Sequence, residues 1–141
     1  QVTQVNTDPI LQALDEGKMP ILSSTASDSH GVCYNVNADN VASQVAMALG
    51  ARRLVYLSDV PGLLRNPEDP STLLSSLAIS EVKPLEEAGV ISAGMLPKVT
   101  SAVEALKAGV NRVHFIDGRM PHSILLEIFT DQGIGTEIVH A

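Results

Sequence analysis

The sequence RLVYLSDVPGLL occupies residues 53–64 and decides the fold class of the chain. Its first six residues are a short apolar run of the kind found in buried strands. Pro61-Gly62 then matches a type II turn, with glycine at the position that needs a positive φ. Such a junction exposes backbone groups at the carboxyl end of a strand, where a ribose or an adenine edge could bind. By itself the junction is common and indicates no particular ligand.

Similar short strands alternate with helices on both sides of this stretch. Before it we expect a helix, a strand, a polar loop and a second helix, at residues 8–17, 19–24, 25–34 and 37–50. After it we expect helices at 80–89, 95–109 and 121–130, and strands at 112–116 and 136–139. Strands separated by helices pair in parallel and need cover on both faces. The pattern therefore predicts one α/β domain with a mainly parallel sheet.

Composition excludes several function classes. The net charge of −7 argues against a nucleic-acid or anionic-membrane binder, because such binding needs clustered Lys and Arg. No apolar run reaches the roughly 20 residues of a membrane helix. Cys33 is the only cysteine, so no intrachain disulfide forms, and we expect a reducing, cytoplasmic location. The chain starts at Gln1 without an initiator Met, which we interpret as a cut end.

Lys98 is the strongest local candidate for chemistry. The order Gly94-Met95-Leu96-Pro97-Lys98 places this lysine in the first turn of a predicted helix, where a cation opposes the helix dipole at a cost of about 0.3–1 kcal/mol. Lys107, in the last turn of the same helix, is where the dipole favours a cation. A bound anion would explain Lys98, because helix N-termini bind anions. A solvated lysine on a flexible stem is the alternative.

A second candidate is the run Tyr34-Asn-Val-Asn-Ala-Asp39. In an extended segment the side chains of Asn35, Asn37 and Asp39 point to the same side. Helix capping is the simpler explanation, with Asn37 as the N-cap and Asp39 favouring the dipole. Capping leaves Asn35 unexplained. No Walker-type Gly-Lys-Ser/Thr loop and no Cys/His metal spacing occurs, so any phosphoryl transfer must use another architecture.

The three motifs lie in the chain in the order 34–39, 53–64 and 94–98. Together and in that order, they resemble the motifs of the amino-acid kinase family. The later stretches Asp117-Gly-Arg-Met-Pro-His-Ser-Ile-Leu-Leu-Glu-Ile-Phe-Thr130 and Gly133-Ile-Gly-Thr136 are similar to those of its acetylglutamate kinases. The resemblance covers nearly all of the chain. It implies a three-layer α/β/α sandwich of the carbamate-kinase type and, over residues 1–141, the C-terminal nucleotide-binding portion, without the glycine-rich substrate-binding half. The implied reaction is phosphorylation of the side-chain carboxylate of N-acetyl-L-glutamate by ATP with Mg²⁺, in arginine biosynthesis.

The resemblance also implies roles for individual residues. Lys98 matches the lysine that stabilises the transferring phosphoryl group, Asp39 the acid that organises the catalytic lysines, and Asn35 the residue that binds acetylglutamate. The segments that match the ATP site are Ser58, Asp59, Val60, Pro61, Gly62, Leu63, Leu64, Val90, Ile91 and Ser92. Mg²⁺ would be held mainly through the nucleotide phosphates, with no metal site of the protein's own.

Three further residues fall where arginine-inhibited members bind their effector, namely His114, Glu127 and Gly133. From the residues alone, His114 in an apolar strand is more often a satisfied core histidine than a ligand. We expect the full-length enzyme to be a homo-oligomer and the isolated chain to be inactive. The alternatives are a sibling kinase acting on another acid and a non-catalytic nucleotide or arginine sensor.

Overall fold

Strand β3 (Arg53–Ser58) is an edge strand of a four-stranded sheet in a computed structural model that describes residues 2–91 and 94–140. The other strands are β4 (Ser76–Ala78), β5 (Arg112–Asp117) and β6 (Thr136–Val139). Their order across the sheet is β3-β5-β6-β4. β3 pairs with β5, and β4 with β6, in parallel, whereas β5 and β6 are antiparallel. The mainly parallel sheet is thus confirmed, with one antiparallel pairing.

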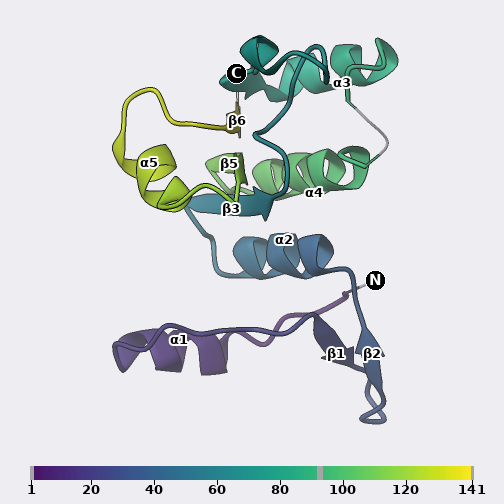
Figure 1. Cartoon of the computed structure of the whole chain (residues 1–141). Coiled ribbons are helices and arrows are strands. Elements are labelled where there is room, and N and C mark those ends of the chain that lie inside the picture. The colour runs from purple at the N-terminus through teal and green to yellow at the C-terminus, as the bar shows by residue number, and fades with distance from the viewer. Residues whose placement is uncertain (1, 92–93, 141) are drawn as a thin grey trace.

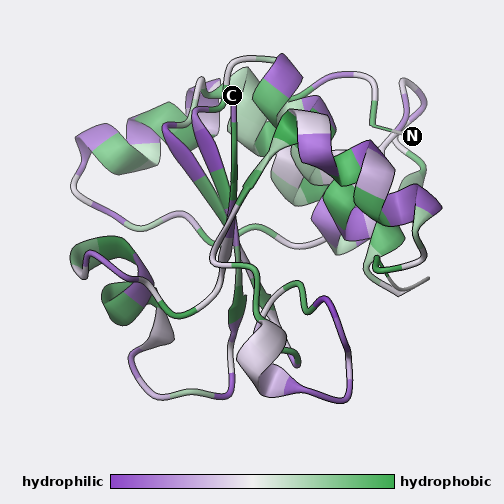
Figure 2. Ribbon diagram, turned by 90° about the horizontal axis from the view of Figure 1, so that it is seen from above, coloured by the Kyte–Doolittle hydropathy of each residue, from purple (hydrophilic) through white to green (hydrophobic). Residues whose placement is uncertain are grey.

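Helices cover both faces of this sheet (Figure 1). α2 (Ala38–Ala48), α3 (Ile79–Glu87) and α4 (Leu96–Lys107) share the main core with the sheet, where residues such as Phe115, Val99 and Ile138 are fully buried. α5 (Ser123–Phe129) packs against β5 from the other face. Seen from above, helices lie on both sides of the strands (Figure 2). The three-layer α/β/α arrangement is confirmed.

The N-terminal region lies on the far side of α2 from the sheet (Figure 1). It contains α1 (Asp8–Asp15) and a two-stranded antiparallel hairpin of β1 (Thr25–Ser27) and β2 (Cys33–Asn35). Its apolar residues, such as Ile10, are not part of the main core cluster. Val41 and Val45 of α2 line a cleft against this region. The chain thus places β2 immediately before the first turn of α2.

Two predictions for this region were wrong. Residues 19–24 form no strand, and Met19 and Ile21 are 82% and 87% exposed. No strand in the described part of the chain lies beside them to supply ladder hydrogen bonds. The predicted loop at 25–34 instead contains the hairpin, because the Asp28 carboxylate accepts the N–H groups of His30 and Val32 and closes the turn.

The antiparallel pairing of β6 has a local cause. Gly135 lies directly against β5, and a Cβ there would meet the Phe115 carbonyl oxygen at 2.2 Å. The Glu127 carboxylate accepts the N–H groups of Ile134 and Gly135, which holds this turn beside the end of β5. β6 therefore starts opposite Phe115 and runs back along β5.

Other element boundaries mostly agree with expectation. β3 and β6 match their predicted bounds, and Asn37 caps α2 by accepting the Asn40 N–H at 3.1 Å. The helix predicted at 80–89 begins one residue earlier, at Ile79, and the Glu81 carboxylate accepts the N–H of Ala78 before it. β4 and the 3-10 turn η1 (Pro70–Thr72) were not predicted, since three residues carry no usable periodicity. None of the described helices has the length and apolarity that crossing a bilayer requires.

Candidate active site

Asp39 and Lys98 form an ion pair between two helices. Asp39 lies in the first turn of α2 and Lys98 in the first turn of α4. The Lys98 Nζ atom donates to the Asp39 Oδ1 and Oδ2 atoms at 2.8 and 2.7 Å. Both side chains are about three-quarters buried. Two candidates that are 59 residues apart in sequence are thus brought together.

The same geometry brings two helix N-termini to one place. Each helix presents unpaired N–H groups and the positive end of its dipole in its first turn. Asn37 uses the Asn40 N–H of α2 for capping, so the prediction that Asn37 is a cap is confirmed. Pro97 in α4 has no N–H to offer, but Lys98 adds a full positive charge. A negatively charged group would be stabilised where the two N-termini meet.

Tyr56 of β3 lies beneath this pair. Its hydroxyl donates to the main-chain carbonyl of Asp39 at 3.2 Å, and its ring centroid is 5.9 Å from the Lys98 Nζ atom. The ring stacks on Phe115 with centroids 5.2 Å apart and planes 8° from parallel. Burial raises the pKa of Tyr56, and the negative charge of Asp39 adds to the effect. Tyr56 is therefore a neutral hydrogen-bond donor near neutral pH.

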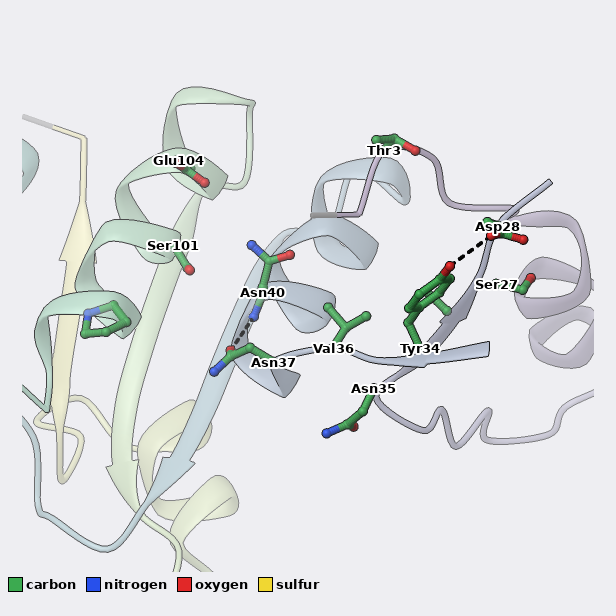
Figure 3. A pocket seen from close by; sticks show the side chains of 12 residues that line it. Thr3, Ser27, Asp28, Tyr34, Asn35, Val36, Asn37, Asn40, Ser101 and Glu104 are labelled. Atoms are coloured by element: carbon green, nitrogen blue, oxygen red, sulfur yellow. Dashed lines mark hydrogen bonds between the residues drawn. The ribbon is translucent and has the colours of Figure 1, made fainter. Parts of the chain in front are cut away.

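A cleft of about 820 Å³ is lined by Asn40 and Pro97, the sequence neighbours of Asp39 and Lys98 (Figure 3). It runs between the hairpin and the exposed side of α4, and its lining includes Asn35, Asn37, Asn40, Pro97, Ser101 and Glu104. Asn35 is exposed in β2 and opens onto this space. The Oδ1 atom of Asn40 is buried and has no hydrogen-bond partner among the described residues. The cleft has several amide side chains in its lining, and its volume is large enough for a small amino-acid derivative.

The predicted ATP-binding loop follows β3 and is anchored to the sheet. Ser58 accepts the Gly118 N–H at 2.8 Å through its carbonyl, and Leu63 donates its N–H to the Thr136 hydroxyl at 2.8 Å. Gly62 has φ 150°, and a Cβ there would meet the Thr136 Oγ1 atom at 2.5 Å. The turn therefore requires glycine at this position.

The members of the predicted ATP set differ in exposure. Leu63 and Ile91 belong to the hydrophobic core, so their side chains face away from solvent. Asp59 is exposed, while the remaining described members are intermediate, apart from buried Gly62. Ser92 lies outside the described residues. Backbone groups of this loop, rather than its buried side chains, are the ones available to a ligand.

Asp117-Gly118-Arg119 opens the stretch that is similar to the acetylglutamate kinases, but the sequence assigned it no role at the ATP site. Ser58 and Asp117 end adjacent strands and are in register, so this turn borders the predicted ATP loop. The Arg119 guanidinium donates to both Asp117 oxygens at 2.9 and 2.8 Å, which lowers the pKa of Asp117 to about 2. Tyr56 was also missed, although strand alternation puts it on the same face as Ser58. Thr136 was missed as the anchor of the loop.

The second candidate site lies on the opposite face of the sheet. His114 of β5 and Glu127 of α5 are both buried, with Nδ1 and Oε1 2.7 Å apart. Gly133 has φ 61°, and a Cβ there would meet the Glu127 Oε2 atom at 2.7 Å. The structure thus brings all three predicted effector residues together, at a cavity of about 220 Å³ that Arg53 and Arg112 also line. His114 Nε2 is buried without a partner among the described residues, so His114 is not the fully satisfied core histidine that the strand pattern favours.

The electrostatics of this second site centre on Glu127. Burial alone would raise the pKa of Glu127, but hydrogen bonds from the Ile134 N–H, His114 and the Gly135 N–H outweigh it and lower the pKa. Glu127 is therefore ionised, and its carboxylate ties α5 to β5 and to the start of β6.

The amino acid kinase family profile matches residues 1–117 of the chain. The chain belongs to the amino acid kinase family. This amino acid kinase chain is 49% identical over 139 residues to the acetylglutamate kinase of Prochlorococcus marinus (strain NATL2A), covering 99% of the chain and 46% of that relative. It is 51% identical over 134 residues to the acetylglutamate kinase of Archaeoglobus fulgidus, a match that covers 95% of the chain and 46% of that relative. The chain thus spans about half the length of the curated relatives that it matches.

Solved structures of two other proteins have a fold similar to that of this amino acid kinase chain. N-acetylglutamate synthase from Neisseria gonorrhoeae, complexed with coenzyme A and L-arginine, has a TM-score of 0.90 and 32% identity over 99% of the chain and 32% of that structure's chain. Carbamate kinase from Giardia lamblia, bound to AMP-PNP, has a TM-score of 0.63 and 24% identity over 83% of the chain and 41% of its own. The second likeness supports the carbamate-kinase-like fold alone.

Proposed function

We propose that this chain carries the ATP-handling portion of an acetylglutamate kinase, which phosphorylates the side-chain carboxylate of N-acetyl-L-glutamate in arginine biosynthesis. The observation that carries the proposal is the Lys98–Asp39 pair at two helix N-termini. Phosphoryl transfer depends on positioning and on positive charge against the equatorial oxygens of the transferring group. Relatives that are about half identical and are named acetylglutamate kinase support the substrate.

In this proposal each residue has a defined role. Lys98 stabilises the negative charge that develops on the transferring phosphoryl group. Asp39 holds the Lys98 ammonium in place but leaves at least one of its three N–H donors free, because the two hydrogen bonds to the carboxylate use at most two of them. Asn35 binds the acetylglutamate from the cleft wall.

ATP would lie beyond the carboxyl end of β3, against the predicted loop set of residues 58–64 and 90–92. Ligands of open α/β sheets bind at this end of the strands. Mg²⁺ neutralises phosphate charge when it is bound. In this proposal Mg²⁺ is held mainly through the nucleotide phosphates.

A chimera tests the function directly. The aligned half of the Prochlorococcus marinus acetylglutamate kinase is replaced by this chain, and ATP-dependent phosphorylation of N-acetyl-L-glutamate is measured. We expect activity in the chimera and none in the isolated 141-residue chain. Aspartate, glutamate, carbamate and uridylate are assayed in parallel. A chimera that folds but phosphorylates a sibling substrate, or none, would refute the assignment and favour the sibling-kinase or sensor alternative.

A second role is favoured by the buried His114–Glu127–Gly133 cluster. We propose that this cavity binds L-arginine as an effector, because an ionised, buried carboxylate beside an open cavity suits a guanidinium. The structurally similar synthase was solved with L-arginine. Calorimetry on the chimera should show arginine binding that is lost in Glu127→Gln. Retained binding in that variant would exclude this cavity.

Two further expectations remain proposals. A homo-oligomer is expected for the full-length enzyme and would be measured by sedimentation of the chimera. A cytoplasmic location is supported by the single, exposed Cys33, which fits a reducing compartment.

A further inference from the structure

We propose that Tyr56 is a positioning residue for phosphoryl transfer, which sets the geometry of the Lys98–Asp39 pair from beneath. The proposal rests on the proposed function and adds to it a buried residue that acts through Asp39 and Lys98. Tyr56 acts through its hydroxyl on Asp39 and through its ring on Lys98.

Asp39 is held at two points. Its carboxylate accepts from Lys98, and its main-chain carbonyl accepts from the Tyr56 hydroxyl. The second contact joins the first turn of α2 to β3. Since the first turn of a helix frays most easily, an anchor to the sheet keeps the Asp39 carboxylate in one place.

Lys98 is restricted by the same aromatic ring. The ammonium group has the Asp39 carboxylate on one side and lies within cation–π range of the Tyr56 ring, 5.9 Å from its centroid. A lysine side chain otherwise samples many rotamers. The remaining N–H donor of Lys98 is therefore aimed more uniformly than in a lysine with a single partner.

Packing alone does not explain a tyrosine at this position. The ring stacks on Phe115 and is 4% exposed, so phenylalanine or leucine would also fill this part of the core. A buried hydroxyl is costly unless it forms a hydrogen bond. Its partner is the carbonyl of the residue that holds the catalytic lysine, which connects the hydroxyl to the site.

The test uses two variants at Tyr56 and a core control in the active chimera. Tyr56→Phe should lower kcat about fivefold, because a rate change of this size corresponds to the net free energy of one hydrogen bond. The KM for ATP should change less than twofold. Tyr56→Leu should lower kcat further. Val113→Ala, a buried change on the same sheet face, should lower stability but leave kcat within twofold.

Proton NMR of the 141-residue chain tests whether the Lys98 side chain lies over the Tyr56 ring. The Lys98 methylene protons, assigned with Lys98→Arg, should show an upfield ring-current shift in the wild type and in Tyr56→Phe. The shift should be lost in Tyr56→Leu and kept in Val113→Ala.

The outcomes separate the two proposals. If the unmodified chimera is inactive, the proposed function fails and this proposal fails with it. If the chimera is active but Tyr56→Phe leaves kcat unchanged, or Val113→Ala lowers kcat as much as Tyr56→Phe does, only the role of Tyr56 is overturned. A wild-type Lys98 shift that Tyr56→Leu does not alter overturns it as well.

Discussion

At the scale of single residues, Lys98 is stable in an unfavourable place because Asp39 faces it. A cation in the first turn of α4 opposes the helix dipole, and the carboxylate from α2 offsets that cost. The two side chains come from separate helices, and they form a charged pair only when α2 packs on α4. A functional reading of the pair explains the arrangement better than solvation, since both side chains are mostly buried.

Removing the Lys98 charge should slow phosphoryl transfer strongly. Lys98→Met in the chimera should lower kcat about 10²–10³-fold, as expected for one preorganised group that stabilises transition-state charge. Steady-state kinetics provides the measurement, and Lys107→Met in the last turn of the same helix is the matched control. Equal losses in both variants would contradict the role of Lys98.

Glu127 makes the fold sensitive to acid. Its folded-state pKa is lowered from 4.5, so its stabilising contribution is present above the unfolded value and is lost as pH falls through the folded pKa. As the pH is lowered below about 4.5, the Tm of the chain should fall. The Tm of Glu127→Gln should fall less steeply over the same range. Thermal unfolding followed by circular dichroism at several pH values measures this. The exposed Glu86→Gln change should leave the slope as in the wild type.

How far the site could be predicted differs between residues. Lys98 and Asp39 stand out because of their positions at predicted helix N-termini. Lys98 opposes the helix dipole there, whereas Asp39 favours it. Tyr56 carries no such signal, since an aromatic residue in a buried strand is ordinary and its partner is 17 residues away. The contact between Asp39 and Lys98 depends on how α2 packs on α4, which no local pattern encodes.

At the scale of elements, the predicted ATP loop depends on its anchor to β6. Thr136 accepts the Leu63 N–H and also leaves no room for a side chain on Gly62. A contact 73 residues apart in sequence thus shapes the turn after β3. The Pro-Gly pair indicated a turn, whereas the residue that holds it could not be found without the sheet order.

Gly62→Ala should be more damaging than an alanine at another left-handed glycine. Gly50 has φ 59° with open space around it, so Gly50→Ala carries only the backbone cost of about 1–2 kcal/mol. Gly62→Ala should cost a further 1–3 kcal/mol or so, because its Cβ would overlap Thr136. Urea unfolding of both variants measures the difference. Equal losses would show that the turn tolerates a side chain.

The elements that were predicted correctly are those with a strong local signal. The helices α2 and α4 combine apolar periodicity with a cap or a closing glycine. The strand β3 combines apolar residues with a following Pro-Gly turn. The segment at 19–24 has strand-like residues, but a strand needs a neighbour, and none of the described strands lies beside it. The hairpin at 25–35 depends on the Asp28 side chain, whose turn-closing role a generally polar stretch conceals.

At the scale of the whole molecule, the segment 19–22 places several apolar side chains on the surface. Met19, Ile21 and Leu22 are 82%, 87% and 52% exposed. A single exposed apolar residue is ordinary, but adjacent ones in an extended segment favour association. β3 is also an edge strand in the described sheet.

The isolated chain should therefore self-associate, and Ile21→Lys should weaken that association without lowering Tm, because Ile21 lies outside the core. Sedimentation velocity over a range of concentrations measures it. Lys18→Glu, beside the segment, serves as a charge control and should change little. Unchanged association in Ile21→Lys would place the contact surface elsewhere.

The chain contains two tyrosines and no tryptophan. Tyr34 lines the cleft and bonds Asp28 at 3.0 Å, while Tyr56 lies under the Lys98–Asp39 pair. Intrinsic fluorescence of this molecule therefore arises from two places, one on each side of the proposed site. A ligand that enters the cleft or displaces Lys98 would change that emission directly, so binding can be followed without a label.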